Sequence, residues 1–296
     1  MQRISTLILF LYLFCSTPAK SQNDSLMLLE SFGGFQQAVS ISAAREEFIF
    51  VSDLGSNKIY KYSKEGKELA NFGGTGLGAN EFNQPYSIDA TNGLDVLVAD
   101  YQNNRIKRLD LKLNFITEFN FNSYNQTAET QRKIYNPSSV VTISTGEIFV
   151  ICDAGNYKAA KINDFTEVGV LFGSSSFGLD RLNKPFKAVS GNSLDIWILD
   201  KAANEVLNFN NFGVYIKKLK APLDSPLISI AYYNDNLYIL FNQALIIYDL
   251  KRGQYSKYYG YPYLKNISDF AMLDKNTVLI LSKVKVYKYK IHKEEQ

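Results

Sequence analysis

Four aspartates close short apolar runs in this 296-residue chain, and their carboxylates are its recurring groups with chemical potential. The runs FIFVSD, DVLVAD, IFVICD and DIWILD end at Asp53, Asp100, Asp153 and Asp200. Oxygen atoms are the ligands that Ca²⁺ prefers, so converging acids would predict a cation site. Polar turns follow these acids, however, and an Asp side chain commonly caps such a turn. We therefore predict that the four aspartates, with Asn57 and Asn104, are structural turn caps.

The sequence contains few histidine and cysteine residues that could act in catalysis or bind a metal. The single histidine, His292, is too few for a zinc site, which needs several ligands. Cys152 lies in an apolar run and favours a buried core position, and Cys15 lies in the N-terminal segment. The sequence holds no Gly-x-Ser-x-Gly elbow, phosphate loop or paired Cys-x-x-Cys motif. It therefore predicts no catalytic residue, no metal and no cofactor.

Aromatic residues in the turns and long connections are the second group of interest. Exposed aromatic rings beside a few charges suit the binding of peptides or sugars, although large aromatics are more often buried between sheets. The connections at residues 73–84, 120–136 and 173–184 are long enough to be functional. We predict a ligand face there, with these candidates: Tyr86, Tyr101, Tyr135, Tyr157, Phe186, Lys187, Tyr261 and Tyr263.

The elements that position these residues are short strands in a repeating pattern. The four runs, and two fainter copies at residues 237–241 and 278–282, recur at intervals of about 45 residues. They are rich in β-branched and aromatic residues and are separated by Gly, Asn, Asp and Pro, which is typical of strands rather than helices. Each unit can be divided into four antiparallel strands. A period of this length with several strands per unit predicts a β-propeller.

The second unit resembles the NHL repeat. It has VAD at residues 98–100, NNRI at 103–106 and LD at 109–110, where that family has an apolar strand, an Asn-x-Arg turn and a strand ending in Asp. The first unit is similar, with Lys58 in place of the arginine. The resemblance covers residues 38–174 well and weakens beyond them. It implies a β-propeller, commonly with six blades.

A count of units gives the same number. Inner strands are expected to start near Ala38, Tyr86, Ser138, Phe186, Leu227 and Ile267. The sixth unit ends after three strands, whereas residues 26–32 (LMLLESF) form an extra strand before the first unit. We predict an all-β, six-bladed propeller of four-stranded antiparallel blades, closed when the strand at about 26–32 joins the last blade. Such closure removes an open sheet edge without a disulfide.

The first residues carry an export signal in this interpretation. Arg3 precedes an apolar run at residues 4–14 that is too short to span a bilayer, and small residues follow. We predict a signal peptide at 1–21, a single propeller domain at 22–296, and a periplasmic or extracellular location without membrane insertion after cleavage. The full chain has a formal net charge of +3, and cleavage removes Arg3 and Lys20, so the mature chain is nearly neutral. We expect no nucleic-acid partner, and we expect the protein to be a monomer.

These features together favour a non-catalytic binding module for a protein, peptide or carbohydrate ligand. Two alternatives stay open at this point. One is a hydrolase similar to lactonases or strictosidine synthase, which would use a central cation such as calcium. The other is a structural component of an envelope assembly. Fold alone does not decide among them, since one fold carries many functions.

Overall fold

The structure is a computed structural model that describes residues 25–143, 148–152, 156–173, 178–191 and 194–292. Within these ranges the chain forms 24 strands and two short helical segments, so the predicted all-β class is confirmed. None of the helices in these ranges is long and apolar enough to cross a membrane.

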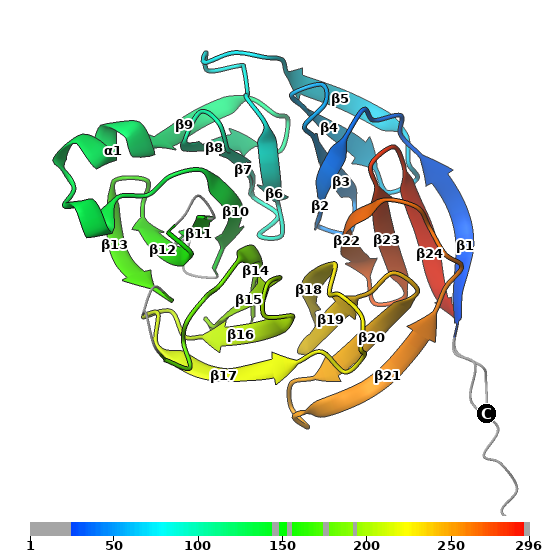
Figure 1. Cartoon of the computed structure of the whole chain (residues 1–296). Helices are drawn as coiled ribbons and strands as arrows, with labels where there is room; N and C mark the ends of the chain where they lie inside the picture. Colours follow the sequence, from blue (N-terminus) through cyan, green and yellow to red (C-terminus); the bar gives the residue numbers. More distant parts are fainter. Residues whose placement is uncertain (1–24, 144–147, 153–155, 174–177, 192–193, 293–296) are drawn as a thin grey trace, which may run out of the picture.

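Four separate sheets of four antiparallel strands follow one another along the chain (Figure 1). The first sheet contains β2 (Ala38–Ala44), β3 (Phe48–Asp53), β4 (Lys58–Ser63) and β5 (Glu68–Gly73). The second contains β6 (Pro85–Asp89), β7 (Asp95–Asp100), β8 (Arg105–Asp110) and β9 (Phe115–Asn120). The third contains β10 (Pro137–Thr142), β11 (Ile148–Cys152), β12 (Lys158–Asn163) and β13 (Glu167–Phe172). The fourth contains β14 (Pro185–Ser190), β15 (Ile196–Asp200), β16 (Glu205–Phe209) and β17 (Tyr215–Lys220).

The last part of the chain and its first strand form one sheet of eight strands, in the order β18-β19-β20-β21-β1-β24-β23-β22. One half contains β18 (Ser229–Tyr233), β19 (Asn236–Leu240), β20 (Ala244–Asp249) and β21 (Gln254–Gly260). The other half contains β22 (Ile267–Asp274), β23 (Thr277–Ser282), β24 (Val286–His292) and β1 (Ser25–Phe32). All the sheets surround a common centre, with β2, β6, β10, β14, β18 and β22 innermost (Figure 1).

Strand β1 joins the two ends of the chain. It pairs antiparallel with β24, from Ser25 opposite His292 to Phe32 opposite Val286, so the pairing predicted from residues 26–32 is confirmed. Its pairing with β21 is a single parallel bridge between Ser25 and Gly260. Leu26 points inward and is buried in the apolar cluster that includes Tyr289 of β24. The N-terminal strand therefore closes the ring by both hydrogen bonding and apolar contact.

The core lies between neighbouring sheets. Trp197 of β15, for example, is buried in a cluster that includes Ile230 of β18 and Leu237 of β19. The inner and middle strands are short and rich in Val, Ile and Leu because they pack against neighbouring sheets, whereas the outer strands β5, β17 and β21 are largely exposed. An inner strand has little contact with bulk water, so its few buried polar side chains need hydrogen-bond partners.

The inner strands all run in the same direction along the central axis, which gives the ring two different faces. The long connections that lead into inner strands, such as residues 74–84, lie on what we call the loop face. The tight turns that follow inner strands, such as residues 45–47, lie on what we call the turn face. The ligand site predicted from the sequence lies on the loop face.

One long connection contains the helical segments. The helix α1 (Phe121–Thr127) and the 3₁₀ helix η1 (Thr130–Arg132) occupy the stretch between β9 and β10 that was predicted as a loop. The Asn120 side chain accepts hydrogen bonds from the backbone N–H groups of Asn122 and Ser123, at 2.9 and 3.4 Å. This is the N-cap geometry that Asn favours, so a single polar residue starts the helix.

The connection at residues 74–82 is fixed by two cations of β8. Arg105 donates hydrogen bonds to the carbonyl oxygens of Leu77 (2.8 Å) and Gly78 (3.1 Å) and pairs with Asp100 at 2.8 Å. Lys107 is fully buried and donates to the carbonyl oxygens of Gly78, Ala79 and Glu81. Buried charges need such partners, so the chain wraps its carbonyl groups around both side chains.

Candidate functional site

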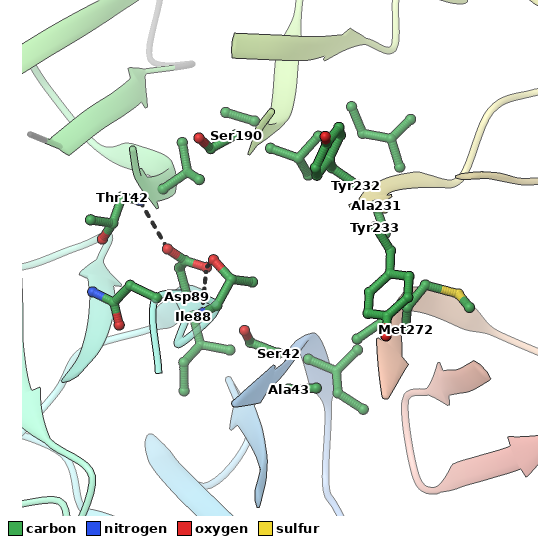
Figure 2. Close-up of a pocket in the computed structure, with 18 of the residues that line it drawn as sticks. Ser42, Ala43, Ile88, Asp89, Thr142, Ser190, Ala231, Tyr232, Tyr233 and Met272 are labelled. Carbon is green, nitrogen blue, oxygen red and sulfur yellow. Dashed lines mark hydrogen bonds between the residues drawn. The ribbon is translucent and has the colours of Figure 1, made fainter. Parts of the chain in front are cut away.

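A cavity of about 470 Å³ opens at the centre of the turn face (Figure 2). Its wall is made by the last residues of the six inner strands and by the turns that follow them. Most of the wall is apolar, and Ile41, Ala43, Ile88, Val140, Val141, Val189, Ala231 and Met272 contribute to it. A volume of this size with a few polar groups in an apolar wall is typical of small-molecule sites.

The depth of the cavity is limited by a ring of polar residues on the inner strands. Each inner strand contributes one residue to this ring. In β6 that residue is Ser87, and the other strands contribute the residue at the matching position. The six residues of this ring are Ser40, Ser87, Ser139, Lys187, Ser229 and Asp269. Serine hydroxyls of the ring accept backbone hydrogen bonds from the next sheet, as Ser139 Oγ does from Ala188 N–H at 3.1 Å. The ring thus connects the sheets below the cavity.

Asp269 is the centre of this ring. Its carboxylate accepts hydrogen bonds from the Ile41 N–H at 3.0 Å and the Ser40 hydroxyl at 3.2 Å, both of β2. The Ser229 hydroxyl of β18 and the Lys187 ammonium of β14 also donate to it. One buried carboxylate therefore joins four inner strands, and the ion pair neutralises its charge.

Asp89 is the carboxylate that faces the cavity. It is the last residue of β6 and is 6% exposed. Its Oδ2 accepts the Thr142 N–H at 2.9 Å, and its Oδ1 accepts the Thr91 hydroxyl at 2.7 Å and the Thr91 N–H at 3.2 Å. Figure 2 shows Asp89 on the cavity wall with its hydrogen bond to Thr142. The carboxylate is thus held in one orientation by its neighbours.

Burial raises the pKa of Asp89 above its ordinary value, and the hydrogen bonds from Thr142 and Thr91 partly oppose that rise. Among the described residues, no basic side chain forms an ion pair with Asp89. The neighbouring Thr142 hydroxyl is buried and has no hydrogen-bond partner within the described part of the chain. Within the described residues, the cavity wall therefore carries a carboxylate without a counter-ion, and a buried hydroxyl lies on the neighbouring strand.

The mouth of the cavity is crossed by a contact between distant sheets. The Tyr233 hydroxyl of β18 donates to Glu46 Oε1 at 2.7 Å, in the turn between β2 and β3. Burial and this bond raise the pKa of Tyr233 to about 12, so it stays a donor at neutral pH. Arg45, in the same turn, donates to the Gly93 carbonyl of the next turn. Arg45 and Glu46 both have φ of 55°, a conformation that side chains other than Asn and Gly seldom adopt.

On the loop face, the structure brings part of the predicted set together. The Tyr86 ring lies 5.2 Å from that of Tyr101 and 6.4 Å from that of Phe186. Lys201 Nζ lies 3.2 Å from the centre of the Phe186 ring, and burial lowers the pKa of Lys201 to about 8. Lys187 lies below them in the polar ring. The space among these side chains is only about 10 Å³, so the rings fill the centre of this face rather than leaving a site open.

The other four candidates lie apart. Tyr135, Tyr157 and Tyr263 are exposed on separate connections, and each has 40% or more of its surface in solvent. Tyr261 is 7% exposed, and its hydroxyl donates to the Phe241 carbonyl. Its role there is contact within the core of the eight-stranded sheet.

The aspartates at the ends of the apolar runs lie in the turns. Asp53 accepts the Gln37 N–H at 2.6 Å and the Gly55 N–H at 3.1 Å. Asp100 accepts the Asn83 N–H at 2.7 Å, and Asp200 accepts N–H groups from both its own turn and the preceding connection. Each of these carboxylates ties a turn to the start of its sheet. Asp153 lies outside the described residues.

The asparagines of the turns make a different connection. Asn57 has φ of 53° and accepts the Gln84 N–H at 2.7 Å. Asn104 has φ of 54° and accepts the Asn136 N–H at 2.8 Å. Asn204, which the sequence analysis did not select, does the same for Leu227 at 2.8 Å. These side chains fasten each turn to the connection that leads into the next sheet.

A calcium site of the kind in the hydrolase alternative would bring several metal-binding side chains together. In the portion of the chain that the structure describes, no three side chains of His, Cys, Asp and Glu gather so that they could hold a metal ion.

The fold defines the class of protein, a β-propeller, through its solved relatives. A streptogramin B lyase structure superposes with a TM-score of 0.61 at 13% identity, covering 90% of this chain and 98% of the other. Selenomethionine-substituted virginiamycin B lyase from Staphylococcus aureus gives 0.62 at 12% identity, covering 90% and 100%. A catalytically inactive histidine-to-alanine variant of that enzyme with quinupristin gives 0.59 at 14% identity, covering 91% and 89%. No protein-family model and no curated protein sequence matches the chain.

These findings correct the functional prediction. The chain was expected to be a non-catalytic binding module whose ligand lies on the loop face. The three solved structures reported above are of lyases, which contradicts that expectation. The physical reason for the error is that aromatic rings close the centre of the loop face, while the large cavity opens on the turn face.

Asp89 is the residue that the sequence analysis missed. It closes an inner strand, whereas the analysis considered only the acids that close the second strand of each unit. The matching positions of the other inner strands are Ser42, Val141, Val189, Ala231 and Ala271. A charged residue at a position that is otherwise small or apolar was the signal that could have found it.

Proposed function

We propose that this protein is an enzymatic β-propeller that binds a compact, mainly apolar small molecule in the turn-face cavity and transfers a proton through Asp89. The observation that carries the proposal is a buried carboxylate with a raised pKa on the wall of a cavity of about 470 Å³. Perturbed acids in a concave apolar site are typical of catalytic groups.

The surroundings of Asp89 suit a general acid–base. A raised pKa brings the carboxyl group closer to the pH at which it can both accept and return a proton. The Thr142 N–H and the Thr91 hydroxyl fix the orientation of its two oxygens at 2.9 and 2.7 Å. In an elimination, the carboxylate would take a proton from the substrate, and the resulting acid would return it to the leaving group. The apolar wall keeps water away from that transfer.

The substrate is expected to differ from that of the structural relatives. Their names refer to streptogramin B and virginiamycin B, and one of them is inactivated when a histidine is replaced. The single histidine of this chain, His292, is the last described residue and belongs to β24, which is not an inner strand. Proton transfer in this chain is therefore assigned to a carboxylate rather than to an imidazole.

We also propose a blade count, a repeat type, a location and an oligomeric state for this protein. We count six blades, because β1 pairs with β24 along its whole length but meets β21 at one bridge, so the eight-stranded sheet divides into two blades there. The VAD and NNRI segments of the second unit support an NHL-type repeat. Export after cleavage near residue 21, and a monomeric state, remain predictions from the sequence, and residues 1–24 lie outside the described ranges.

The test is turnover by the purified chain. The chain is incubated with virginiamycin B and with a set of compact lactones, esters and amines, and products are followed by mass spectrometry. We expect conversion of at least one compact compound, and a loss of about 100-fold or more in kcat/KM in Asp89→Asn, as removal of a general acid–base gives.

The control is Asp249→Asn, which removes a carboxylate of the turn face that does not line the cavity. Its kcat/KM should equal that of the wild type. Full activity in Asp89→Asn, or no conversion of any compound, would contradict the proposal.

A further inference from the structure

The ionisable groups around the turn-face cavity are few. Those that line it are Arg45, Glu46, Asp89 and Lys187, with the phenols of Tyr232 and Tyr233. Arg45 and Glu46 belong to the turn at the mouth and are exposed to solvent. Water can therefore screen both of these charges.

The charges deeper in the wall are not balanced. Lys187 forms an ion pair with Asp269 in the polar ring, so its positive charge is already matched. Asp89 is 6% exposed, and its hydrogen bonds come from uncharged donors of Thr91 and Thr142. Within the described residues, this leaves Asp89 as the buried charge of the cavity without an opposite charge. A buried carboxylate is stable when a cation pairs with it, so a ligand cation would supply what the protein lacks.

The groups beside Asp89 fit an ammonium rather than a metal ion. Asp89 lines the cavity, and its hydrogen bonds come only from the uncharged donors Thr91 and Thr142, so its carboxylate can accept the N–H of an ammonium as well. The Tyr232 and Tyr233 side chains line the side of the cavity across from Asp89 (Figure 2) and offer aromatic surface to the hydrocarbon part of a ligand. The rest of the wall is aliphatic and would contact a hydrocarbon body. A metal ion is usually held by several carboxylate, imidazole or thiolate groups at one point, and no three His, Cys, Asp or Glu side chains of the described residues gather in this way.

We infer that the cavity takes a compact organic amine in its protonated form, with the ammonium hydrogen-bonded to Asp89 and the hydrocarbon part against the aliphatic wall. This inference rests on the proposed site and names the class of its substrate or ligand. The ammonium is recognised by the charge and hydrogen bond of Asp89, whereas the hydrocarbon part is recognised by shape and apolar contact.

The test compares an amine with its uncharged counterpart on the same protein. Binding of 2-phenylethylamine and of 2-phenylethanol to the wild-type chain is measured by isothermal titration calorimetry at neutral pH, where the amine is protonated. We expect the amine to bind about tenfold tighter or more, as a charge-assisted hydrogen bond in a desolvated site gives. Equal or weaker binding of the amine, including no binding of either compound, would overturn the inference.

Two variants assign the preference to the cavity. Asp89→Asn should remove the amine preference and leave the alcohol affinity nearly unchanged, whereas Asp249→Asn should keep the preference. Retention of the preference in Asp89→Asn would also overturn the inference. The wild-type comparison stands without these variants if Asp89→Asn does not fold.

The outcome separates this inference from the proposed function. An amine preference with no turnover of any compound would support the ligand class and contradict the enzymatic proposal. Turnover of a neutral compound that depends on Asp89, without an amine preference, would do the reverse.

Discussion

The Lys187 ammonium of β14 donates a hydrogen bond to the Asp269 carboxylate of β22, and this pair spans the centre of the ring. β14 and β22 belong to different sheets, with β18 between them (Figure 1). Asp269 is also the acceptor for groups of β2 and β18. We predict that Lys187→Met lowers the free energy of unfolding by about 3 kcal/mol, because it leaves a buried carboxylate without its cation. Urea denaturation followed by tryptophan fluorescence measures this change.

The matched control is Lys218→Met. Lys218 forms a salt bridge with Glu205 at 3.0 Å, but its side chain is 35% exposed. Loss of that pair should cost less than about 1 kcal/mol, since water screens it. Equal costs for the two variants would show that the central pair has no special role.

A second prediction concerns the closing strand. Leu26→Ala should destabilise the protein by about 2–4 kcal/mol, because Leu26 is buried against β24. Leu28 lies two residues after Leu26 in β1 and is 51% exposed. Leu28→Ala should therefore change stability by about 0.5 kcal/mol or less. Thermal denaturation of both variants gives the comparison. A larger effect at Leu28 than at Leu26 would mean that β1 is oriented differently.

A third prediction concerns the connection held by β8. Arg105→Lys should cost about 2 kcal/mol, because an ammonium cannot make the separate bonds to Asp100, Leu77 and Glu118 that the planar guanidinium makes. Amide hydrogen exchange should increase at residues 77–82 before it increases elsewhere. Unchanged exchange in that segment would contradict the role assigned to Arg105.

The pH dependence of stability gives a fourth prediction. Burial raises the pKa of Asp89 above its ordinary value of 3.8. As pH rises from about that value, the unfolded chain therefore loses this proton before the folded chain does, and the free energy of unfolding falls until Asp89 has ionised in the folded state. Asp89→Asn lacks this contribution.

The stability of Asp89→Asn relative to the wild type should thus increase with pH through that window and then become constant. Chemical denaturation of both proteins at a series of pH values measures it. A difference that decreases with pH would mean that the pKa of Asp89 is lowered in the folded protein.

Much of the fold follows from sequence periodicity. The inner strand β2 starts at Ala38 and β22 at Ile267, as the spacing of the apolar runs predicts, and β1 pairs with β24 as the extra strand at residues 26–32 predicts. These features are local patterns of alternating burial plus one count of strands, so the sequence contains them directly. The helix α1 was missed because seven residues starting after Asn120 give too short a pattern to detect.

The site was not predictable in the same way. Asp89 lies in the segment YSIDA, which looks like an ordinary inner strand, and its importance arises from its burial on the cavity wall without an ion-pair partner among the described residues. Conversely, Tyr86, Tyr101 and Phe186 looked exposed at the ends of strands, yet their rings pack together at the centre of the loop face. Which end of the ring is open depends on how side chains from different sheets meet, and a repeat pattern does not contain that information.

The most direct test of the account is the titration of the Asp89 carboxyl group itself. Carbon-13 NMR of the chain with labelled aspartate, with the Asp89 resonance assigned from Asp89→Asn, gives its pKa in the folded protein. We predict a midpoint clearly above 3.8. A midpoint at or below that value would contradict the assignment of Asp89 as a desolvated proton-transfer group of the cavity.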